Sequence, residues 1–185
     1  MRYAGIQYDD VVNGDGIRVT LFVQGCDHHC HNCHNPETWD PKGGEEFTEK
    51  VQESIFNYIK YTPFVKGLTL SGGDPLQEDN LPYIKQLLLD FRKTFKDTKD
   101  VWLYTGSDFE DLFYYYRMSL IPGVTLGLNT SYIVDILHLI DVLVDGEYID
   151  SLRDINLKFR GSSNQKLIDV KQTIKTKSIV YYKEV

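Results

Sequence analysis

Soft metal-binding side chains are crowded into one short stretch of this 185-residue chain. All three of its cysteines, Cys26, Cys30 and Cys33, fall within eight positions, and four of its five histidines lie between Cys26 and His34. Thiolates select iron-sulfur clusters or zinc over hard, oxygen-loving cations. An odd number of cysteines this close together cannot build a disulfide framework. The stretch is therefore predicted to hold a metal centre or to present reactive thiols.

Two kinds of metal centre fit the C-x3-C-x2-C spacing. A four-iron cluster held by the three cysteines leaves one iron without a protein ligand, which a substrate can then bind. A zinc ion needs a fourth ligand, and a loop histidine can supply it: His28, His29, His31 or His34. Structural zinc sites usually bring two separated ligand pairs, and no second cysteine pair follows in this chain. The pattern favours iron without excluding zinc.

Predicted strands and helices alternate along the chain. The loop that carries Cys26, Cys30 and Cys33, called the cysteine loop below, directly follows a strand. β-branched and aromatic residues predict strands at residues 17–24, 67–71, 101–106, 124–128 and 141–146. Apolar periodicity predicts helices at residues 48–59, 81–95, 108–116 and 132–138, with Thr48 and Asp108 as N-caps. Past residue 147 the pattern loosens, with a short strand expected at residues 157–160, a polar loop at 161–166 and a β-prone segment at 178–183.

This alternation predicts an α/β fold. Strands separated by helices are joined by right-handed crossovers and form a mostly parallel sheet. About five strands are too few for a complete eight-stranded barrel, which takes roughly 250 residues, so we expect an open, incomplete (βα) barrel in a single domain spanning residues 1–185. Ligands in such folds bind at the carboxyl ends of the strands. The cysteine loop is thus expected in an active site.

Composition and charge argue against two classes of protein, those that bind nucleic acid and those that span a membrane. The formal net charge is −7, and Lys and Arg are scattered, so a nucleic-acid partner is not expected. No apolar run approaches the roughly 18 residues of a membrane span, and residues 1–5 lack the apolar core of a signal peptide. These features predict a cytoplasmic protein with no membrane partner.

The cysteine spacing resembles the cluster loop of the radical S-adenosylmethionine superfamily. Its surroundings, residues 15–26 and 33–39, are similar to the anaerobic ribonucleotide reductase activating proteins. Further similar blocks follow in the expected order at residues 70–76, 102–106, 144–146 and 161–165. The resemblance extends to about residue 170, and residues 171–185 match nothing. Asn32 departs from the pattern, because this position is often aromatic in the superfamily and glycine in this family.

The resemblance implies an activating enzyme. Cys26, Cys30 and Cys33 would hold a 4Fe-4S cluster whose open iron is chelated by S-adenosylmethionine. Reductive cleavage of this cofactor would release methionine and a 5′-deoxyadenosyl radical, which takes hydrogen from a glycine of the anaerobic ribonucleoside-triphosphate reductase large subunit. An electron donor such as flavodoxin would reduce the cluster. Two alternatives are an activase of another glycyl radical enzyme, of the pyruvate formate-lyase type, and a non-catalytic zinc-binding adaptor.

Residues at strand ends and in the family-like blocks are the candidates for binding S-adenosylmethionine. They are Gly72, Gly73, Asp74, Asn32, His34, Thr105, Asp145, Asn164 and Gln165. The two glycines lack Cβ atoms, so their backbone can approach the methionine part of the cofactor. Asp74 adds negative charge near its ammonium group. No catalytic residue is expected beyond the cluster and the cofactor.

Overall fold

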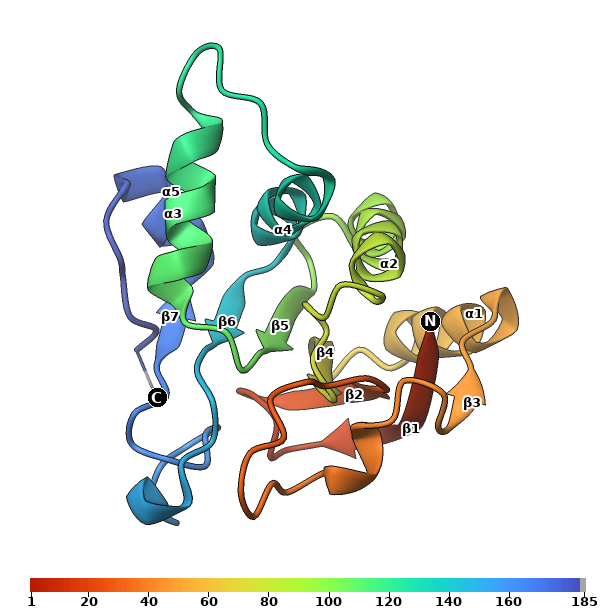
Figure 1. The fold of residues 1–185 in the computed structure, drawn as a ribbon. Coiled ribbons are helices and arrows are strands. Elements are labelled where there is room, and N and C mark those ends of the chain that lie inside the picture. The colour runs from red at the N-terminus through yellow and green to blue at the C-terminus, as the bar shows by residue number, and fades with distance from the viewer. Residues whose placement is uncertain (184–185) are drawn as a thin grey trace.

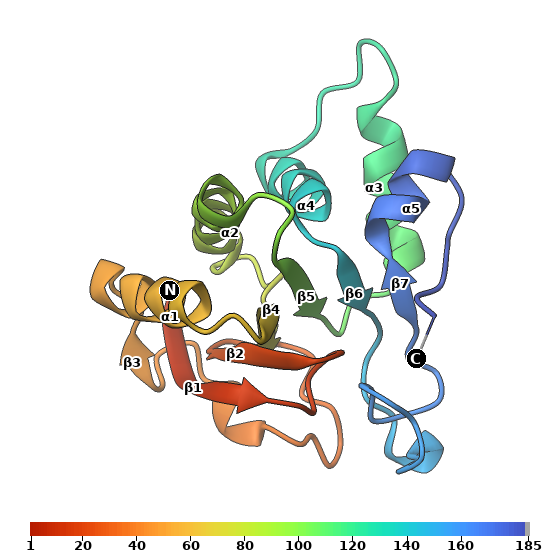
Figure 2. The same ribbon diagram turned by 180° about the vertical axis from the view of Figure 1, so that it is seen from behind.

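A computed structural model of the chain describes residues 1–183 and shows one seven-stranded sheet with five α-helices gathered on one side of it (Figures 1 and 2). The strands are β1 (Arg2–Asp10), β2 (Ile17–Val23), β3 (Glu45–Glu46), β4 (Val65–Gly72), β5 (Asp100–Tyr104), β6 (Val142–Val144) and β7 (Leu167–Asp169). The helices are α1 (Glu49–Tyr61), α2 (Leu81–Phe95), α3 (Phe109–Ser119), α4 (Leu128–Leu139) and α5 (Val170–Thr176), with short 3-10 helices η1 (Pro36–Thr38) and η2 (Asp150–Leu152).

The sheet is parallel in its centre and antiparallel at both sides. Its order is β3-β1-β2-β4-β5-β6-β7, and β2, β4, β5 and β6 run parallel to one another. β1, β3 and β7 pair antiparallel to their neighbours. The predicted α/β fold with a parallel centre is confirmed. The sheet is open between its edges β3 and β7, and a barrel is not confirmed within residues 1–183.

Two apolar layers cover the two faces of the parallel strands. Residues 67–71 of β4 are all buried, as is typical of a parallel strand with both faces covered. α2 buries an i, i+3, i+4 stripe on one face, made by Leu81, Ile84, Leu88, Phe91 and Phe95. A smaller cluster around Trp102 covers the other face, where Phe159 and Tyr182 pack edge-on against its ring. The chain past residue 171 therefore helps to close this second layer.

Three expected segments are not strands. Residues 124–128 connect α3 to α4: a turn at residues 121–123 leads into an exposed Val124, and no strand lies beside it to pair with. Residues 157–159 form bends, with Phe159 in the left-handed region at φ 61°. Residues 178–183 contribute a single antiparallel bridge, between Tyr181 and Ile168. High β-propensity was misleading here because it describes a fit to a neighbouring strand. Residues 124–128 and 157–160 pair with no strand of the described chain, and residues 178–183 meet β7 at one bridge only.

Arg18 of β2 is completely buried beneath this second layer. Its guanidinium donates to Thr69 Oγ1 at 2.7 Å and to the Leu68 carbonyl at 3.0 Å, and it lies over the Trp102 ring at 5.3 Å. It also forms an ion pair with Asp100 at 2.5 Å. Since a buried charge is costly unless it is paired, these contacts tie β2, β4 and β5 together.

Asp10 ends β1 and organises the turn into β2. Its buried carboxylate accepts hydrogen bonds from the Val12 backbone at 2.7 Å, the Asn13 side chain at 2.6 Å and Thr20 Oγ1 at 2.6 Å. Burial alone would raise the pKa of Asp10, but these hydrogen bonds outweigh it and lower the pKa. The ionised form is therefore the one that the fold stabilises.

We expect Asp10→Ala to lower the free energy of unfolding by about 2 kcal/mol at pH 7, because buried donors lose their acceptor. A lowered pKa contributes stability above the unfolded value near 4, and this contribution is lost as pH falls through the folded value. The difference from wild type should therefore shrink below pH 4. Urea unfolding between pH 3 and pH 7 measures it, with exposed Glu53→Ala as control. A difference that does not change with pH would contradict the assignment.

No helix among residues 1–183 is both long enough and apolar enough to cross a membrane.

Candidate metal centre

The four parallel strands end side by side, and this register assembles the site. Val23 of β2 pairs with Gly72 of β4, and Tyr104 of β5 pairs with Val144 of β6. The loops that follow these four strands line one cavity of about 500 Å³. The cysteine loop, residues 24–35, is the first of them. The cysteine loop and the cavity thus lie at the carboxyl ends of the strands, where the loop was expected.

Backbone hydrogen bonds hold the cysteine loop against the loop after β4. Gly73 N–H donates to the Val23 carbonyl at 2.8 Å, and Asp74 N–H donates to the Gly25 carbonyl at 2.7 Å. On its other side the loop continues into η1, where Gly25 N–H donates to the Thr38 carbonyl at 2.8 Å. Backbone hydrogen bonds alone therefore hold the start of the cysteine loop in place.

The two glycines after β4 are needed for these contacts. Gly72 has φ 98°, and a Cβ atom there would lie 2.8 Å from Phe22 Cα. A Cβ atom on Gly73 would lie 2.4 Å from the Gly25 carbonyl oxygen. Both residues line the cavity. A Cβ atom on either glycine, however, would collide with β2 or with the cysteine loop. Close packing against β2 and the cysteine loop therefore already requires glycine at both positions.

We expect Gly73→Ala to cost about 2 kcal/mol of stability, because the added methyl group must push the Gly25 carbonyl away. The displaced loop should also take up less iron during anaerobic reconstitution. Gly5→Ala is the matched control, since a Cβ there meets nothing within 4 Å. Thermal unfolding and iron analysis of the two variants check the prediction. Equal stability for both variants would show that the loop adapts to the methyl group.

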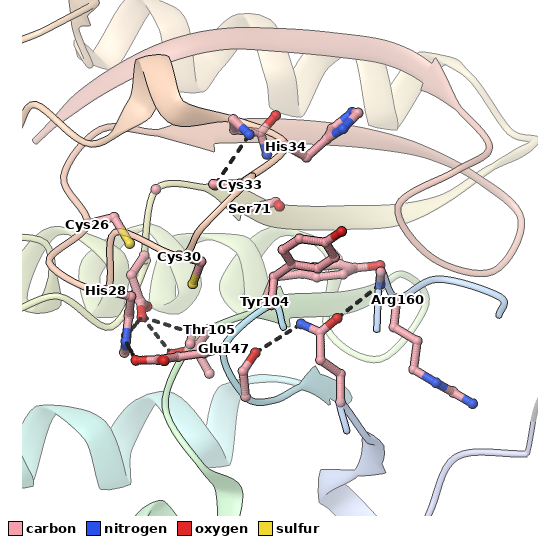
Figure 3. Close-up of a pocket in the computed structure, with 18 of the residues that line it drawn as sticks. Cys26, His28, Cys30, Cys33, His34, Ser71, Tyr104, Thr105, Glu147 and Arg160 are labelled. Carbon is pink, nitrogen blue, oxygen red and sulfur yellow. Dashed lines mark hydrogen bonds and ion pairs between the residues drawn. The ribbon is translucent and has the colours of Figure 1, made fainter. Parts of the chain in front are cut away.

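All three cysteines line the cavity as free thiols. In Figure 3 the sulfurs of Cys26 and Cys30 point to the side where His28 and Thr105 lie. Burial raises the pKa of Cys26 to about 11, although the backbone amides of His28 and His29 favour its thiolate. Burial also raises the pKa of Cys30. Any metal that binds these thiols must therefore displace their protons.

The donor set fits an iron-sulfur cluster. Among residues 1–183, no three His, Cys, Asp or Glu side chains stand close enough together to hold one metal ion. A tetrahedral zinc site would place its sulfurs about 3.8 Å apart. Each cysteine of a cluster instead binds a different iron, so the thiols need only face one shared space, as Cys26, Cys30 and Cys33 do.

His28 links the cysteine loop to two other loops. Its Nε2 lies 2.9 Å from Asp74 Oδ2, and its Nδ1 lies 2.8 Å from Glu147 Oε1. The hydrogen bond with Asp74 is the main cause that raises the pKa of His28 to about 9, with a smaller contribution from Glu147 and against an opposing effect of burial. This ring is therefore engaged by two carboxylates, an arrangement that leaves neither nitrogen for a metal.

The structure brings seven of the nine proposed cofactor-binding residues to the cavity. They are Gly72, Gly73, Asp74, Asn32, His34, Thr105 and Gln165. Asn32 donates to Asp150 at 3.1 Å, and exposed His34 turns its ring away from the Cys26 and Cys30 sulfurs in Figure 3. The Gln165 amide is engaged within its own loop, where it binds the backbones of Gly146 and Gly161.

Asp145 and Asn164 do not line the cavity, so the prediction that they contact a ligand there is not supported. The Asp145 carboxylate is buried and accepts from the backbone amides of Phe109 at 3.1 Å and Lys166 at 2.7 Å. It thereby accepts from the first amide of α3, whose N-cap is Asp108, and holds the loop before β7. Asn164 donates to the Glu147 carbonyl at 2.9 Å. A polar residue at a strand end was equally consistent with this structural role.

Several residues that line the cavity were not predicted from the sequence. Tyr104, Glu147, Tyr148, Asp150, Arg153 and Arg160 belong to this group. Tyr104 and Glu147 sit at or just after the ends of β5 and β6, so strand-end position was the available signal for them. The others lie on the irregular loop from residue 146 to 165, where periodicity carries no information.

Comparisons with known proteins agree with this geometry. The family described as "4Fe-4S single cluster domain" matches residues 12–168. An anaerobic ribonucleoside-triphosphate reductase-activating protein of Escherichia coli (strain K12) is 38% identical over 157 residues, which cover 84% of this chain and 90% of the relative. The protein of the same name from Enterobacteria phage T4 is 36% identical over 167 residues, which cover 90% and 93%.

A third relative with that name, from Vibrio cholerae, is 39% identical over 157 residues, which cover 84% of this chain and 90% of the relative. Matches of this length cover most of the chain and most of each relative. The chain belongs to the family of anaerobic ribonucleoside-triphosphate reductase-activating proteins and contains a 4Fe-4S single cluster domain.

Proposed function

We propose that this chain is a radical S-adenosylmethionine enzyme that generates a glycyl radical on anaerobic ribonucleoside-triphosphate reductase. Cys26, Cys30 and Cys33 hold the 4Fe-4S cluster. When bound, the cluster supplies the electron that breaks a carbon–sulfur bond of S-adenosylmethionine. The reaction belongs in the cytoplasm, where thiols stay reduced, and a small redox protein such as flavodoxin is the proposed electron donor.

One observation carries the proposal: the only three thiols of the chain face one cavity that also has room for a small molecule. Three cysteines leave one iron of a four-iron cluster open to a ligand. The volume of about 500 Å³ lies within the range of small-molecule sites. A purely structural centre needs neither an open iron nor adjoining space.

The chain's own residues bind and orient the cofactor in this proposal. Gly72, Gly73 and Thr105 line the cavity from the ends of β4 and β5, and Asn32 and His34 lie on the cysteine loop itself. The Asp74 carboxylate already accepts from Leu76, Thr105 and Gly106, so we assign it the role of holding these loops in place. Asp145, which the cavity does not reach, is removed from the proposed cofactor site.

The target of the radical rests on the relatives, whose names specify anaerobic ribonucleoside-triphosphate reductase. Another glycyl radical enzyme, of the pyruvate formate-lyase type, would use the same chemistry. A non-catalytic zinc adaptor is disfavoured by the match to a 4Fe-4S domain.

Electron paramagnetic resonance tests the proposal directly. The reduced, reconstituted chain is mixed without oxygen with S-adenosylmethionine and the reductase, and a glycyl radical doublet should appear on the reductase. A pyruvate formate-lyase type enzyme in place of the reductase is the matched control and should give no doublet. Cofactor cleavage without a radical on the reductase would exclude this target. One zinc and no labile sulfide per chain would exclude the mechanism.

A further inference from the structure

His28 sits midway between two proposed cluster ligands, and both of its ring nitrogens are taken up by carboxylates. It follows Cys26 by two residues and precedes Cys30 by two. Its side chain is 25% exposed, and each ring nitrogen meets a carboxylate within 2.9 Å. Because the two nitrogens point in different directions, two such contacts fix both the position and the tilt of the ring.

The carboxylate on one side is held firmly by other residues. Asp74 is buried, with 3% of its surface exposed. Its Oδ2, which binds His28, also accepts from Thr105 Oγ1 at 2.9 Å and from Gly106 N–H at 3.1 Å, and its Oδ1 accepts from Leu76 N–H at 2.8 Å. A carboxylate with this many donors cannot move with the histidine, so it defines where the ring must lie.

Gly106 shapes the space for the ring. A Cβ atom at this position would lie 2.5 Å from His28 Cδ2, so the imidazole packs directly on the backbone after β5. The ring is therefore held by a fixed acceptor and by a flat backbone surface.

The carboxylate on the other side connects the cysteine loop to the loop after β6. Glu147 is exposed, but its backbone carbonyl accepts from Asn164 at 2.9 Å, and the neighbouring Gly146 carbonyl accepts from Gln165 at 2.9 Å. A second contact between the same two loops is the Asn32–Asp150 hydrogen bond of 3.1 Å. Figure 3 shows His28 and Thr105 on the side of the cavity that the Cys26 and Cys30 sulfurs face.

We propose that His28 is a positioning residue that fastens the cysteine loop to the ends of β4 and β6 through Asp74 and Glu147. It thereby limits the release of iron from Cys26 and Cys30. This inference rests on the proposed function for its cluster readout, and the mechanical link itself exists in the chain without iron.

The test compares three single variants and one double variant, His28→Ala combined with Glu147→Ala. His28→Ala removes both contacts, and Glu147→Ala removes one contact at an exposed position that should not endanger folding. His31→Ala is the matched control, because His31 is an exposed histidine of the same loop. For each chain we measure the rate at which a chelator removes iron, the electron paramagnetic resonance spectrum of the reduced cluster, and amide hydrogen exchange of residues 25–35 in the iron-free chain.

We expect His28→Ala to lose iron about tenfold faster than wild type, since removing groups that orient ligands typically weakens metal binding by this order. Its spectrum should broaden, and hydrogen exchange of the loop should accelerate. Glu147→Ala should show at least a roughly twofold effect in the same direction, and adding it to His28→Ala should change little, because both act on one link. His31→Ala should behave as wild type.

The proposal is overturned if His28→Ala matches His31→Ala in iron release, spectrum and hydrogen exchange. If His28→Ala does not fold, Glu147→Ala decides, and a variant that matches the control in every measurement overturns the proposal. A wild-type chain that binds no cluster would contradict the proposed function alone, because hydrogen exchange of the iron-free loop would still test the link.

Discussion

Replacing any one of Cys26, Cys30 and Cys33 by Ala is expected to abolish radical formation. In the proposed cluster each thiolate would bind its own iron, so the loss of one would leave a second iron without a protein ligand and expose the cluster to loss. Activity should fall by more than about 100-fold, beyond the effect of removing a group that merely orients a ligand. Iron and labile sulfide per chain, measured after anaerobic reconstitution, should fall with it.

The fold itself should tolerate these replacements. All three cysteines are only half-buried, so the iron-free variants are expected to unfold within about 1 kcal/mol of the iron-free wild type. His31→Ala is the control, with unchanged iron and activity. A cysteine variant that kept a full cluster and full activity would remove that residue from the ligand set.

Replacing Arg18 by Met is expected to give the largest loss of stability, about 3 kcal/mol. Methionine fills most of the volume but leaves Asp100 without its cation, and breaking one partner of a buried pair is strongly destabilising. Burial already raises the pKa of Asp100, and Arg18 is the main influence that opposes this. The Asp100 side chain is 26% exposed, so the loss of stability should fall at the lower end of the range for breaking a buried ion pair, about 3 to 5 kcal/mol. Urea unfolding at pH 7 measures the effect.

Lys66→Ala provides the contrast for Arg18. Lys66 pairs with Asp15, but the two side chains are 45% and 29% exposed. Exposed ion pairs contribute little, so this variant should lie within about 0.5 kcal/mol of wild type. Equal losses of stability for Arg18→Met and Lys66→Ala would mean that burial of the Arg18 guanidinium does not determine how much its ion pair contributes to stability.

The parallel centre of the fold could be predicted because each of its strands is a short run of mostly apolar residues that ends at glycine or at a polar turn residue. β1 was missed, since its residues at 2–10 alternate weakly and it pairs antiparallel to the strand that follows it. β7 and α5 are short elements in a segment without a clear period. Their place in the sheet depends on tertiary contacts that no local pattern records.

The cysteine ligands could be predicted because neither core packing nor a disulfide framework calls for three soft donors within eight positions. Asp145 and Asn164 could not be separated from true lining residues, since a side chain that caps a backbone amide and one that binds a ligand have the same polarity. The contacts of His28 could not be predicted for a different reason, which is distance along the sequence. Its role depends on Asp74 and Glu147, which lie 46 and 119 positions away in the chain.

The open sheet also has a consequence for how the chain behaves at high concentration. A sheet that does not close leaves strand edges on which a second molecule can pair and begin to aggregate. At one edge β3 is only two residues long, and both are glutamates. A second copy approaching this edge would set like charges opposite one another, with few free backbone groups gained in return. Glu45 and Glu46 thus disfavour pairing with a second copy at this edge of the sheet.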